Sequence, residues 1–256
     1  MTTPDQTIDF GYTEVPRTEK AARVKGVFDS VARDYDRMND AMSVGLHRVW
    51  KDMAITKLNP QPGEFLLDIA GGTGDLARRF IRQADDKRKR RGGATSRAII
   101  SDINTDMLMA GIDARKDGDM DLARVTANAE CLPFADACAD AVVISFGIRN
   151  VTDRDAALRE FHRVLKPGGR LAVLEFSTPT TKIIRAVHDA YSFAVIPRLG
   201  KLITGDRDSY QYLVESIQRF PTPEQFAAMM TGAGFHKVGW DAYTMGAVNL
   251  HMGWKV

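Results

Sequence analysis

Hydrophobic and polar positions alternate in blocks along most of this chain of 256 residues. A short apolar run predicts a buried strand, and apolar residues spaced three or four positions apart predict the inner face of a helix. The pattern predicts strands at 65–69, 98–102, 123–126, 141–146 and 170–175, with helices at 75–84, 105–117 and 153–165 between them. Such alternation is typical of a parallel sheet with helices on both faces.

The last part of the chain departs from this alternation. A helix is expected from about Thr222, and two strand-like runs, 236–243 and 248–255, then follow without a helix between them. Consecutive strands joined by a short turn are antiparallel. The whole pattern therefore predicts an α/β fold, a doubly wound, mostly parallel, seven-stranded sheet with a C-terminal antiparallel hairpin at its edge.

The remaining segments divide the chain into a tail, a cap and an insertion. Residues 1–20 are polar and predict a flexible tail, while 21–60 has helical periodicity and predicts an N-terminal cap on a single domain spanning 21–256. Residues 177–220 interrupt the alternation, and their apolar helical face predicts a lid that packs on its own core or walls an apolar substrate, two compatible roles. The basic, glycine-containing stretch 85–96 predicts a solvated loop.

Charge and cysteine content limit the classes of partner. The 35 basic and 33 acidic residues leave a net charge of +2, so we expect no nucleic-acid partner. Cys131 and Cys138 lack a metal-ligand spacing and are expected to be free thiols in a reducing compartment, with no metal site. The chain shows no signal sequence and no apolar run near the ~20 residues of a membrane span. We therefore expect a cytoplasmic protein, with peripheral contact at the inner face of a membrane left open.

A glycine-rich turn stands between the first strand of the alternating region and the helix that follows it. The stretch LLDIAGGTGDLARRF (66–80) places Gly72, Thr73 and Gly74 in this turn. Such a turn brings backbone N–H groups against a ligand without interference from Cβ atoms. Dinucleotides, nucleotide phosphates and S-adenosylmethionine all bind over turns of this kind, so the acids around the turn must distinguish them.

Two acids flank the turn, Asp68 at the strand end and Asp75 in the first helical turn. A dinucleotide fingerprint can be forced onto 72–77, but it places a pyrophosphate at the helix N-terminus. At ~5 Å and an effective dielectric of ~20, each carboxylate would repel a phosphate charge by about 3 kcal/mol. S-adenosylmethionine carries a sulfonium and an ammonium and no phosphate. The acids therefore favour S-adenosylmethionine over a dinucleotide.

Polar residues at the ends of the next strands extend this interpretation. Asp102 ends the second strand, where its carboxylate can accept from both ribose hydroxyls, or can instead cap the helix near Thr105. Asn128 follows the third strand, and its amide offers a donor and an acceptor to an adenine edge. Ser145 ends the fourth strand. All project from the carboxyl ends of strands, where open α/β sheets bind ligands.

Five longer stretches carry a family resemblance: VFDSVARDYDRMNDAMSVGLHRVWK (27–51), DIAGGTGDLA (68–77), ANAECLPF (127–134), ISFGIRNVTDRDAALREFHRVLKPGGRLAVLEFS (144–177), and a run containing DAYSF, IPRLG and SYQYLVESI (189–217). From about residue 20 to its end, the chain resembles the ubiquinone/menaquinone biosynthesis C-methyltransferase family. The resemblance implies the Rossmann-like class I methyltransferase fold with S-adenosylmethionine as cofactor. It places cofactor contacts at Thr73, Asp102, Asn128, Ala129 and Ser145, beside Asp68, Gly72 and Gly74 from the turn itself.

The resemblance also implies a reaction. It is S-adenosylmethionine-dependent methylation of a ring carbon in a polyprenylated quinol, either 2-polyprenyl-6-methoxy-1,4-benzoquinol or demethylmenaquinol, in ubiquinone or menaquinone biosynthesis. A ring carbon attacks a sulfonium methyl when an adjacent phenol is ionised and the two carbons are held in line. Two alternatives stay open: a methyltransferase acting on oxygen or nitrogen of another small molecule, and a non-catalytic cofactor- or quinol-binding subunit of a quinone-biosynthesis assembly.

Two residues are candidates for the catalytic chemistry. Arg149 lies just past the fourth strand, where its guanidinium can stabilise a developing phenolate directly or through a bound water. A structural pairing of Arg149 with Asp153 or Asp155 is the alternative. Tyr35, in the helical cap, can close over the cofactor and donate a hydrogen bond, or can serve the core.

Three further residues are candidates for contact with the substrate: His188, Tyr191 and Tyr210 in the inserted segment. The apolar face of 183–203, with basic residues at its edges, suits contact with lipid headgroups near a long isoprenoid tail. A homo-oligomer or a quinone-biosynthesis complex is left open as a further partner.

Overall fold

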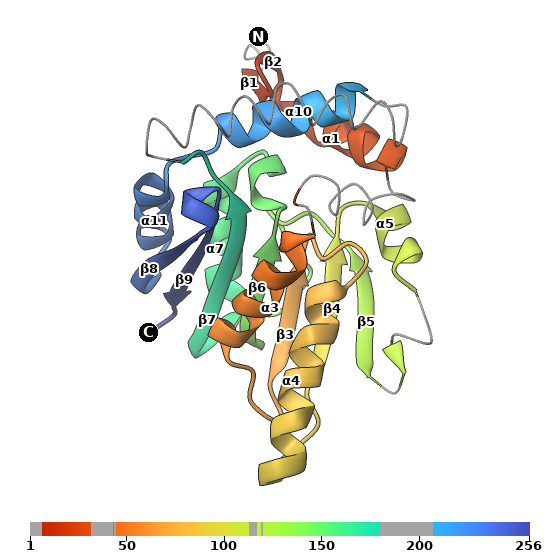
Figure 1. Ribbon diagram of the computed structural model, residues 1–256, viewed down its shortest axis with the longest axis vertical. Coiled ribbons are helices and arrows are strands. Elements are labelled where there is room, and N and C mark those ends of the chain that lie inside the picture. Colours follow the sequence, from red (N-terminus) through yellow and green to blue (C-terminus); the bar gives the residue numbers. More distant parts are fainter. Residues whose placement is uncertain (1–6, 32–42, 44, 113–116, 119, 180–206) are drawn as a thin grey trace.

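The computed structural model describes residues 7–31, 43, 45–112, 117–118, 120–179 and 207–256. Its centre is a seven-stranded sheet in the order β5-β4-β3-β6-β7-β9-β8 (Figure 1). The strands are β3 (Phe65–Ile69), β4 (Arg97–Asp102), β5 (Asp121–Thr126), β6 (Ala139–Ser145), β7 (Leu165–Phe176), β8 (His236–Tyr243) and β9 (Val248–Trp254). The pairs from β5 to β7 are parallel, and β9 pairs antiparallel with both β7 and β8. The predicted doubly wound sheet with a C-terminal antiparallel hairpin is confirmed.

Helices cover both faces of this sheet. On one face lie α3 (Leu46–Leu58) and α4 (Asp75–Arg91), and on the other lie α7 (Arg154–Val164) and α11 (Pro223–Gly232) (Figure 1). Side chains alternate between the two cores along β3, because Leu66 packs with α3 and α4 while Leu67 packs with α7. Burial on both faces explains why the strands have nearly continuous apolar runs.

Local signals in the sequence set where these helices begin. Thr222 forms a capping box with Gln225, so α11 begins where the sequence predicted. The helix predicted at 105–117 is shorter, because α5 (Thr105–Ala110) ends before Gly111. No helix in the described ranges is long and apolar enough to cross a membrane.

The basic stretch 85–96 is not a loop along its whole length, as the sequence had suggested. The helix α4 continues to Arg91, and Gly92 ends it with a φ of 76°. Asp85 pairs with Arg88 at 2.6 Å and with Lys89 at 2.9 Å, which are helical spacings. Basic side chains in the last turn of a helix also interact favourably with its dipole. The basic run is therefore helical to Arg91.

Residues 7–16 form a pair of strands, where the sequence predicts a flexible tail. Strands β1 (Thr7–Phe10) and β2 (Thr13–Pro16) pair as an antiparallel hairpin that leads into α1 (Arg17–Val31). The ring of Phe10 stacks on Tyr212 of α10 (Arg207–Gln218), with centroids 4.3 Å apart. A two-stranded hairpin is marginal alone, so this long-range contact, which the sequence pattern does not show, accounts for the difference.

Described helices of the predicted cap and insertion lie near the carboxyl ends of the parallel strands (Figure 1). Among the described residues, α3 and most of α1 belong to the predicted cap, and α10 belongs to the predicted insertion. Figure 1 shows α1 and α10 side by side above the carboxyl ends of the parallel strands, and residues of the two helices are in contact. A pocket lies beneath α1.

Candidate functional site

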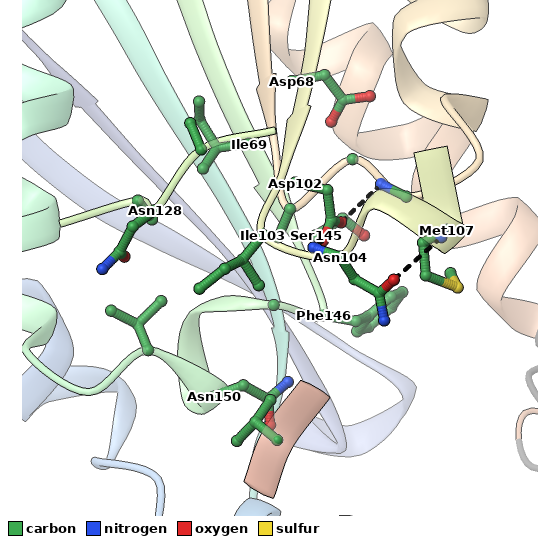
Figure 2. Close-up of a pocket in the computed structure, with 18 of the residues that line it drawn as sticks. Asp68, Ile69, Asp102, Ile103, Asn104, Met107, Asn128, Ser145, Phe146 and Asn150 are labelled. Atoms are coloured by element: carbon green, nitrogen blue, oxygen red, sulfur yellow. Dashed lines mark hydrogen bonds between the residues drawn. The ribbon is translucent and has the colours of Figure 1, made fainter. Parts of the chain in front are cut away.

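The pocket is formed by loops that leave the carboxyl ends of β3, β4, β5 and β6. Its lining comes from 68–73 and 75–76, from 102–104 and 107, from 127–130, and from 145–147 and 150–152, and is completed by residues of α1 and by Lys51 of α3. Figure 2 shows Asp68, Asp102, Asn128, Ser145 and Asn150 arranged around this space. Its position matches the place at which open α/β sheets bind ligands.

The glycine turn forms the side of the pocket nearest β3. Gly72 donates its backbone N–H to Asp102 Oδ2 at 2.9 Å. Gly74 caps α4 with a φ of 83°, and a Cβ there would collide with the side chain of Ile100. Glycine is required at position 74 because both its dihedral angle and its close packing exclude a side chain. Gly74 therefore packs against Ile100 on the side of the turn away from the pocket, and it does not line the pocket.

Asp68 lies at the end of β3 and is almost completely buried. Its Oδ2 accepts a hydrogen bond from the N–H of Ala77 at 3.0 Å, while its Oδ1 has no partner in the described part of the chain. Burial raises the pKa of Asp68 to about 7, although the Ala77 N–H and the nearby Lys51 oppose this. An unpaired buried carboxylate oxygen at a pocket wall is suited to a cationic ligand.

Asp75 differs from the sequence interpretation because protein cations already satisfy it. Lys51 Nζ lies 3.2 Å from Asp75 Oδ2, and Arg79 Nε lies 3.0 Å from Asp75 Oδ1. Burial would raise the pKa of Asp75, but Lys51 and Arg79 outweigh it and hold that pKa below its ordinary value. Of the two acids that flank the turn, Asp68 is therefore the one with an oxygen left for a ligand.

Asp102 bridges the glycine turn and the start of α5. Its Oδ1 accepts from the N–H of Asn104 at 2.9 Å, in addition to the bond from Gly72 to Oδ2. Burial raises its pKa, against the effect of these backbone donors. The alternative that Asp102 caps the helix is wrong, because Asn104 Oδ1 accepts from the N–H groups of Asp106 and Met107. The carboxylate of Asp102 lines the pocket instead.

The remaining predicted cofactor residues lie after β5 and at the end of β6. Asn128 accepts from the N–H of Glu130 at 3.0 Å through Oδ1, and Ala129 lies between them. The Oγ of Ser145 is buried without a partner among the described residues. The structure thus brings seven of the eight predicted cofactor residues to one pocket: Asp68, Gly72, Thr73, Asp102, Asn128, Ala129 and Ser145.

Arg149 is buried beside the pocket, and its own side chain does not belong to the pocket wall. Its Nη1 donates to Glu175 Oε1 and to the carbonyl oxygen of Phe146, both at 2.6 Å. The expected alternative partner, Asp153, instead caps α7 and pairs with Arg17 at 2.6 Å. Arg149 therefore holds the loop after β6, from which Phe146 and Asn150 reach the pocket.

Sequence reasoning missed three residues that shape this site. Glu175 is the partner of Arg149, Lys51 enters the pocket from α3, and Tyr212 donates from its hydroxyl to Asn150 Oδ1 at 3.1 Å. No spacing pattern connects residues this far apart in the chain. The one available signal was the single acid, Glu175, inside the otherwise apolar run LAVLEF.

The substrate-facing candidates lie largely in parts of the chain that the structure does not describe. Tyr35, His188 and Tyr191 fall outside the described residues. Tyr210 lies in α10, where the structure describes its backbone alone. The roles predicted for these four residues stay predictions.

Known proteins resemble this chain over its whole length. The model of the ubiE/COQ5 methyltransferase family matches residues 17–255. A Caulobacter vibrioides protein named ubiquinone/menaquinone biosynthesis C-methyltransferase UbiE is 53% identical, over 96% of this chain and 97% of its own. A Nitrobacter hamburgensis protein of the same name is 50% identical over the full length of both chains.

Solved structures support the same fold. A methyltransferase from Thermotoga maritima, described as S-adenosylmethionine-dependent and as a possible histamine N-methyltransferase, superposes with a TM-score of 0.61 at 18% identity. The superposition covers 90% of this chain and 99% of that one. At this identity the likeness establishes the fold alone. The evidence for family membership is the sequence match, and by it the chain belongs to the ubiE/COQ5 methyltransferase family.

Proposed function

We propose that this protein transfers a methyl group from S-adenosylmethionine to a ring carbon of a polyprenylated quinol. The acceptor is 2-polyprenyl-6-methoxy-1,4-benzoquinol, demethylmenaquinol or both, as in ubiquinone and menaquinone biosynthesis. The observation that carries the proposal is 53% identity, over nearly the entire chain, to a relative named as such a C-methyltransferase.

The residues of the pocket fit S-adenosylmethionine better than they fit a phosphate-bearing cofactor. Asp68 offers a buried, unpaired Oδ1 to a cation, and the Asp102 carboxylate is placed to accept from ribose hydroxyls. Asn128 and Ala129 supply the adenine side, and Ser145 offers a hydroxyl without a partner in the described part of the chain. A pyrophosphate would face both Asp68 and Asp102 across the glycine turn, which is unfavourable.

S-adenosylmethionine supplies an electrophilic methyl group when bound, and the protein must make the ring carbon nucleophilic. The loop after β6 carries Phe146 and Asn150 to the pocket, and Arg149 holds it in place. The Nε–H of Arg149 has no acceptor among the described residues, and because this side chain lies behind the pocket wall, we propose that it acts on the quinol oxygen through a bound water. Arg149 is therefore proposed as the catalytic cation, acting through this donor, with Tyr35 donating a second hydrogen bond from the cap.

The quinol itself is proposed to enter from the cap side, against His188, Tyr191 and Tyr210. The segment 183–203 is proposed to contact lipid headgroups at the inner face of the membrane while the isoprenoid tail is bound. Liposome flotation tests this contact, and flotation unchanged by Ile183→Asp together with Ile184→Asp contradicts it. Association into a homo-oligomer or a quinone-biosynthesis complex belongs to the same proposal and is tested by the mass of the particle in detergent.

The decisive experiment uses isotopically labelled S-adenosylmethionine and two short-tailed acceptors, a demethyl-naphthoquinol and a methoxy-benzoquinol, kept chemically reduced. Label on a ring carbon of either acceptor supports the proposal and identifies the pathway. Label on oxygen reassigns the enzyme to oxygen methylation. Absence of label, with cofactor binding confirmed in parallel, favours a non-catalytic binding subunit. The oxidised acceptors serve as controls, because a quinone has no phenol to ionise.

A further inference from the structure

Lys51 is a buried cation that lines the pocket from α3, whereas most of the pocket wall comes from the loops after β3, β4, β5 and β6. It belongs to α3, its residue is 8% exposed, and its side chain lines the pocket beside the glycine turn. Its ammonium has three donors, and the hydrogen bond to Asp75 Oδ2 at 3.2 Å uses one. No other described residue accepts a hydrogen bond from this ammonium, which leaves two donors for a ligand in the pocket.

The position of Lys51 relative to Asp68 is informative. Lys51 and Asp68 line the same pocket, and Lys51 is bonded to Asp75, the acid on the other side of the glycine turn. The charge of Lys51 also lowers the pKa of Asp68, so this end of the pocket combines a cation with the carboxyl group that has the unpaired Oδ1. In the described part of the chain one other lysine, Lys25 of α1, lines the pocket, and it is exposed to solvent.

S-adenosylmethionine has a matching pair of charges. Its methionyl end carries an ammonium and a carboxylate on the same carbon, so an acid and a base next to each other would bind both groups. A desolvated carboxylate also needs a charge-assisted partner, because burying it alone is costly. The glycine turn lies between Asp68 and Asp75, the partner of Lys51.

We propose that Lys51 binds the methionyl carboxylate of S-adenosylmethionine, while Asp68 binds the adjacent ammonium. This assignment rests on the cofactor of the proposed function and adds to it the residue that recognises the amino-acid end. Through Lys51, the helix α3 would contact the bound cofactor. Lys51 also makes the pocket selective for S-adenosylmethionine and S-adenosylhomocysteine over sulfonium compounds that lack the carboxylate.

A purely structural role explains Lys51 less well. Asp75 keeps a second cationic partner, because Arg79 Nε lies 3.0 Å from its Oδ1. Burying an ammonium is costly, and a single 3.2 Å hydrogen bond, to the Asp75 oxygen that Arg79 does not bind, offsets only part of that cost. A ligand carboxylate at the remaining donors accounts for the burial of Lys51.

The test compares two ligands that differ by one carboxylate. Binding of S-adenosylmethionine and of decarboxylated S-adenosylmethionine is measured by calorimetry on the full-length protein and on Lys51→Met, Lys51→Gln and Lys51→Arg. Lys51→Met and Lys51→Gln are expected to weaken S-adenosylmethionine by about 10- to 100-fold and the decarboxylated compound by less than about twofold. Lys51→Arg is expected to keep most of the discrimination, and Lys25→Met is the matched control for a lining lysine.

Each other outcome overturns the assignment. An equal loss for both ligands means that Lys51 acts through Asp75 or the fold, and no loss for either means that it does not face the ligand. The wild type must bind S-adenosylmethionine more than tenfold more tightly than the decarboxylated compound. If one variant fails to fold, the same ratio of affinities in the other variants decides. These measurements need no quinol, so they stand even if the acceptor is misassigned. A wild-type protein that does not bind S-adenosylmethionine overturns both proposals.

Discussion

Arg149 and Glu175 form a fully buried ion pair, with Nη1 and Oε1 2.6 Å apart. The backbone N–H of Arg149 also donates to the second oxygen of Glu175, Oε2, at 3.3 Å. The same guanidinium holds the carbonyl of Phe146, whose φ of 55° is unusual for a residue with a side chain. The pair therefore fixes a strained loop that forms part of the pocket wall.

Removing one charge of this pair should affect both stability and catalysis. Glu175→Gln leaves Arg149 as a buried cation without a carboxylate, and we expect it to lower the free energy of unfolding by about 3 kcal/mol. The loop should then lose its fixed geometry, so the rate of methyl transfer should fall more than tenfold while cofactor affinity changes little. Urea unfolding, calorimetry and turnover of a reduced short-tailed quinol measure the three quantities.

An exposed ion pair provides the control. Glu19 and Arg23 lie 2.8 Å apart in α1, and about half of each side chain is exposed. Glu19→Gln should change the free energy of unfolding by less than about 0.5 kcal/mol. The double variant Arg149→Met with Glu175→Met should regain stability without regaining activity. Recovery of methyl transfer in that double variant would show that the pair has no part in the reaction.

The sheet could be predicted from the sequence because its signals are local. Each central strand is an apolar run, and the capping residues that mark α7 and α11, Asp153 and Thr222, stand directly before their helices. The hairpin at 7–16 escaped prediction because its polar strands depend on the contact between Phe10 and Tyr212, which lie 202 residues apart. The continuation of α4 to Arg91 was missed because a run of basic residues has no apolar periodicity.

The candidate site divides in the same way. Asp68, Asp102 and Ser145 were found because they end strands, and parallel strands bring their ends to one edge of the sheet. The partners of charged groups were not found, because Glu175 and Lys51 reach the site through tertiary packing. Sequence therefore predicted where charge gathers, and the structure was needed to show which charges are already neutralised.

Asp68 should make cofactor binding depend on pH. Its pKa is raised to about 7, mainly by burial, so the ligand-free carboxyl is protonated in acid and ionised in base. A cationic ligand prefers the ionised form, so affinity for S-adenosylmethionine should rise from pH 6 to pH 8 and then level off. Asp68→Asn should bind more weakly and remove this rise. Asp75→Asn should retain it, because the pKa of Asp75 is already lowered by Lys51 and Arg79.

The raised pKa of Asp68 should also make the free energy of unfolding depend on pH. Because the folded pKa lies above the ordinary value, the carboxyl stabilises the fold fully below about pH 3.8, and this contribution is lost as pH rises through about 7. Asp68→Asn should therefore stabilise the ligand-free protein more at pH 8 than at pH 5, by up to about 3 kcal/mol. Urea titrations at the two pH values measure the difference. An equal effect at both would contradict the raised pKa.

Tyr212 should affect the reaction through Asn150. Its hydroxyl donates to Asn150 Oδ1 at 3.1 Å, and Asn150 lines the pocket. Tyr212→Phe keeps the stacking on Phe10 and removes this bond, so we expect a loss of about 1 kcal/mol in stability. The rate with the quinol should fall severalfold at unchanged affinity for S-adenosylmethionine, since Asn150 lies on the wall away from Asp68 (Figure 2).

The matched control for Tyr212 is a hydrogen bond of the same length away from the pocket. Ser96 donates from Oγ to the carbonyl of Gln61 at 3.1 Å, and neither residue lines the pocket. Ser96→Ala should cost similar stability without changing the rate. Equal rate effects in the two variants would mean that loss of stability alone explains the result for Tyr212→Phe.

Arg78 is expected to hold the carbonyl side of the glycine turn. It is 5% exposed, and it donates to the carbonyl of Thr73 at 2.7 Å, to the carbonyl of Gly111 at 2.5 Å and to Asp117 at 2.6 Å. Arg124 shares two of these acceptors, Gly111 at 3.0 Å and Asp117 at 2.8 Å, and does not contact Thr73 in the described structure. The two arginines therefore differ mainly in their contact with the turn.

Variants of the two arginines therefore distinguish support of the glycine turn from general stabilisation of the fold. A lysine cannot span three acceptors as the guanidinium fork does, so Arg78→Lys should free the Thr73 carbonyl and weaken S-adenosylmethionine binding about tenfold. Arg124→Lys should lower stability by a similar amount, about 1 kcal/mol, and leave binding within about twofold. Calorimetric affinities and urea unfolding of both variants decide the matter. If Arg124→Lys weakens binding as much as Arg78→Lys, the cluster acts by stabilising the whole edge of the sheet, and the turn needs no separate support from Arg78.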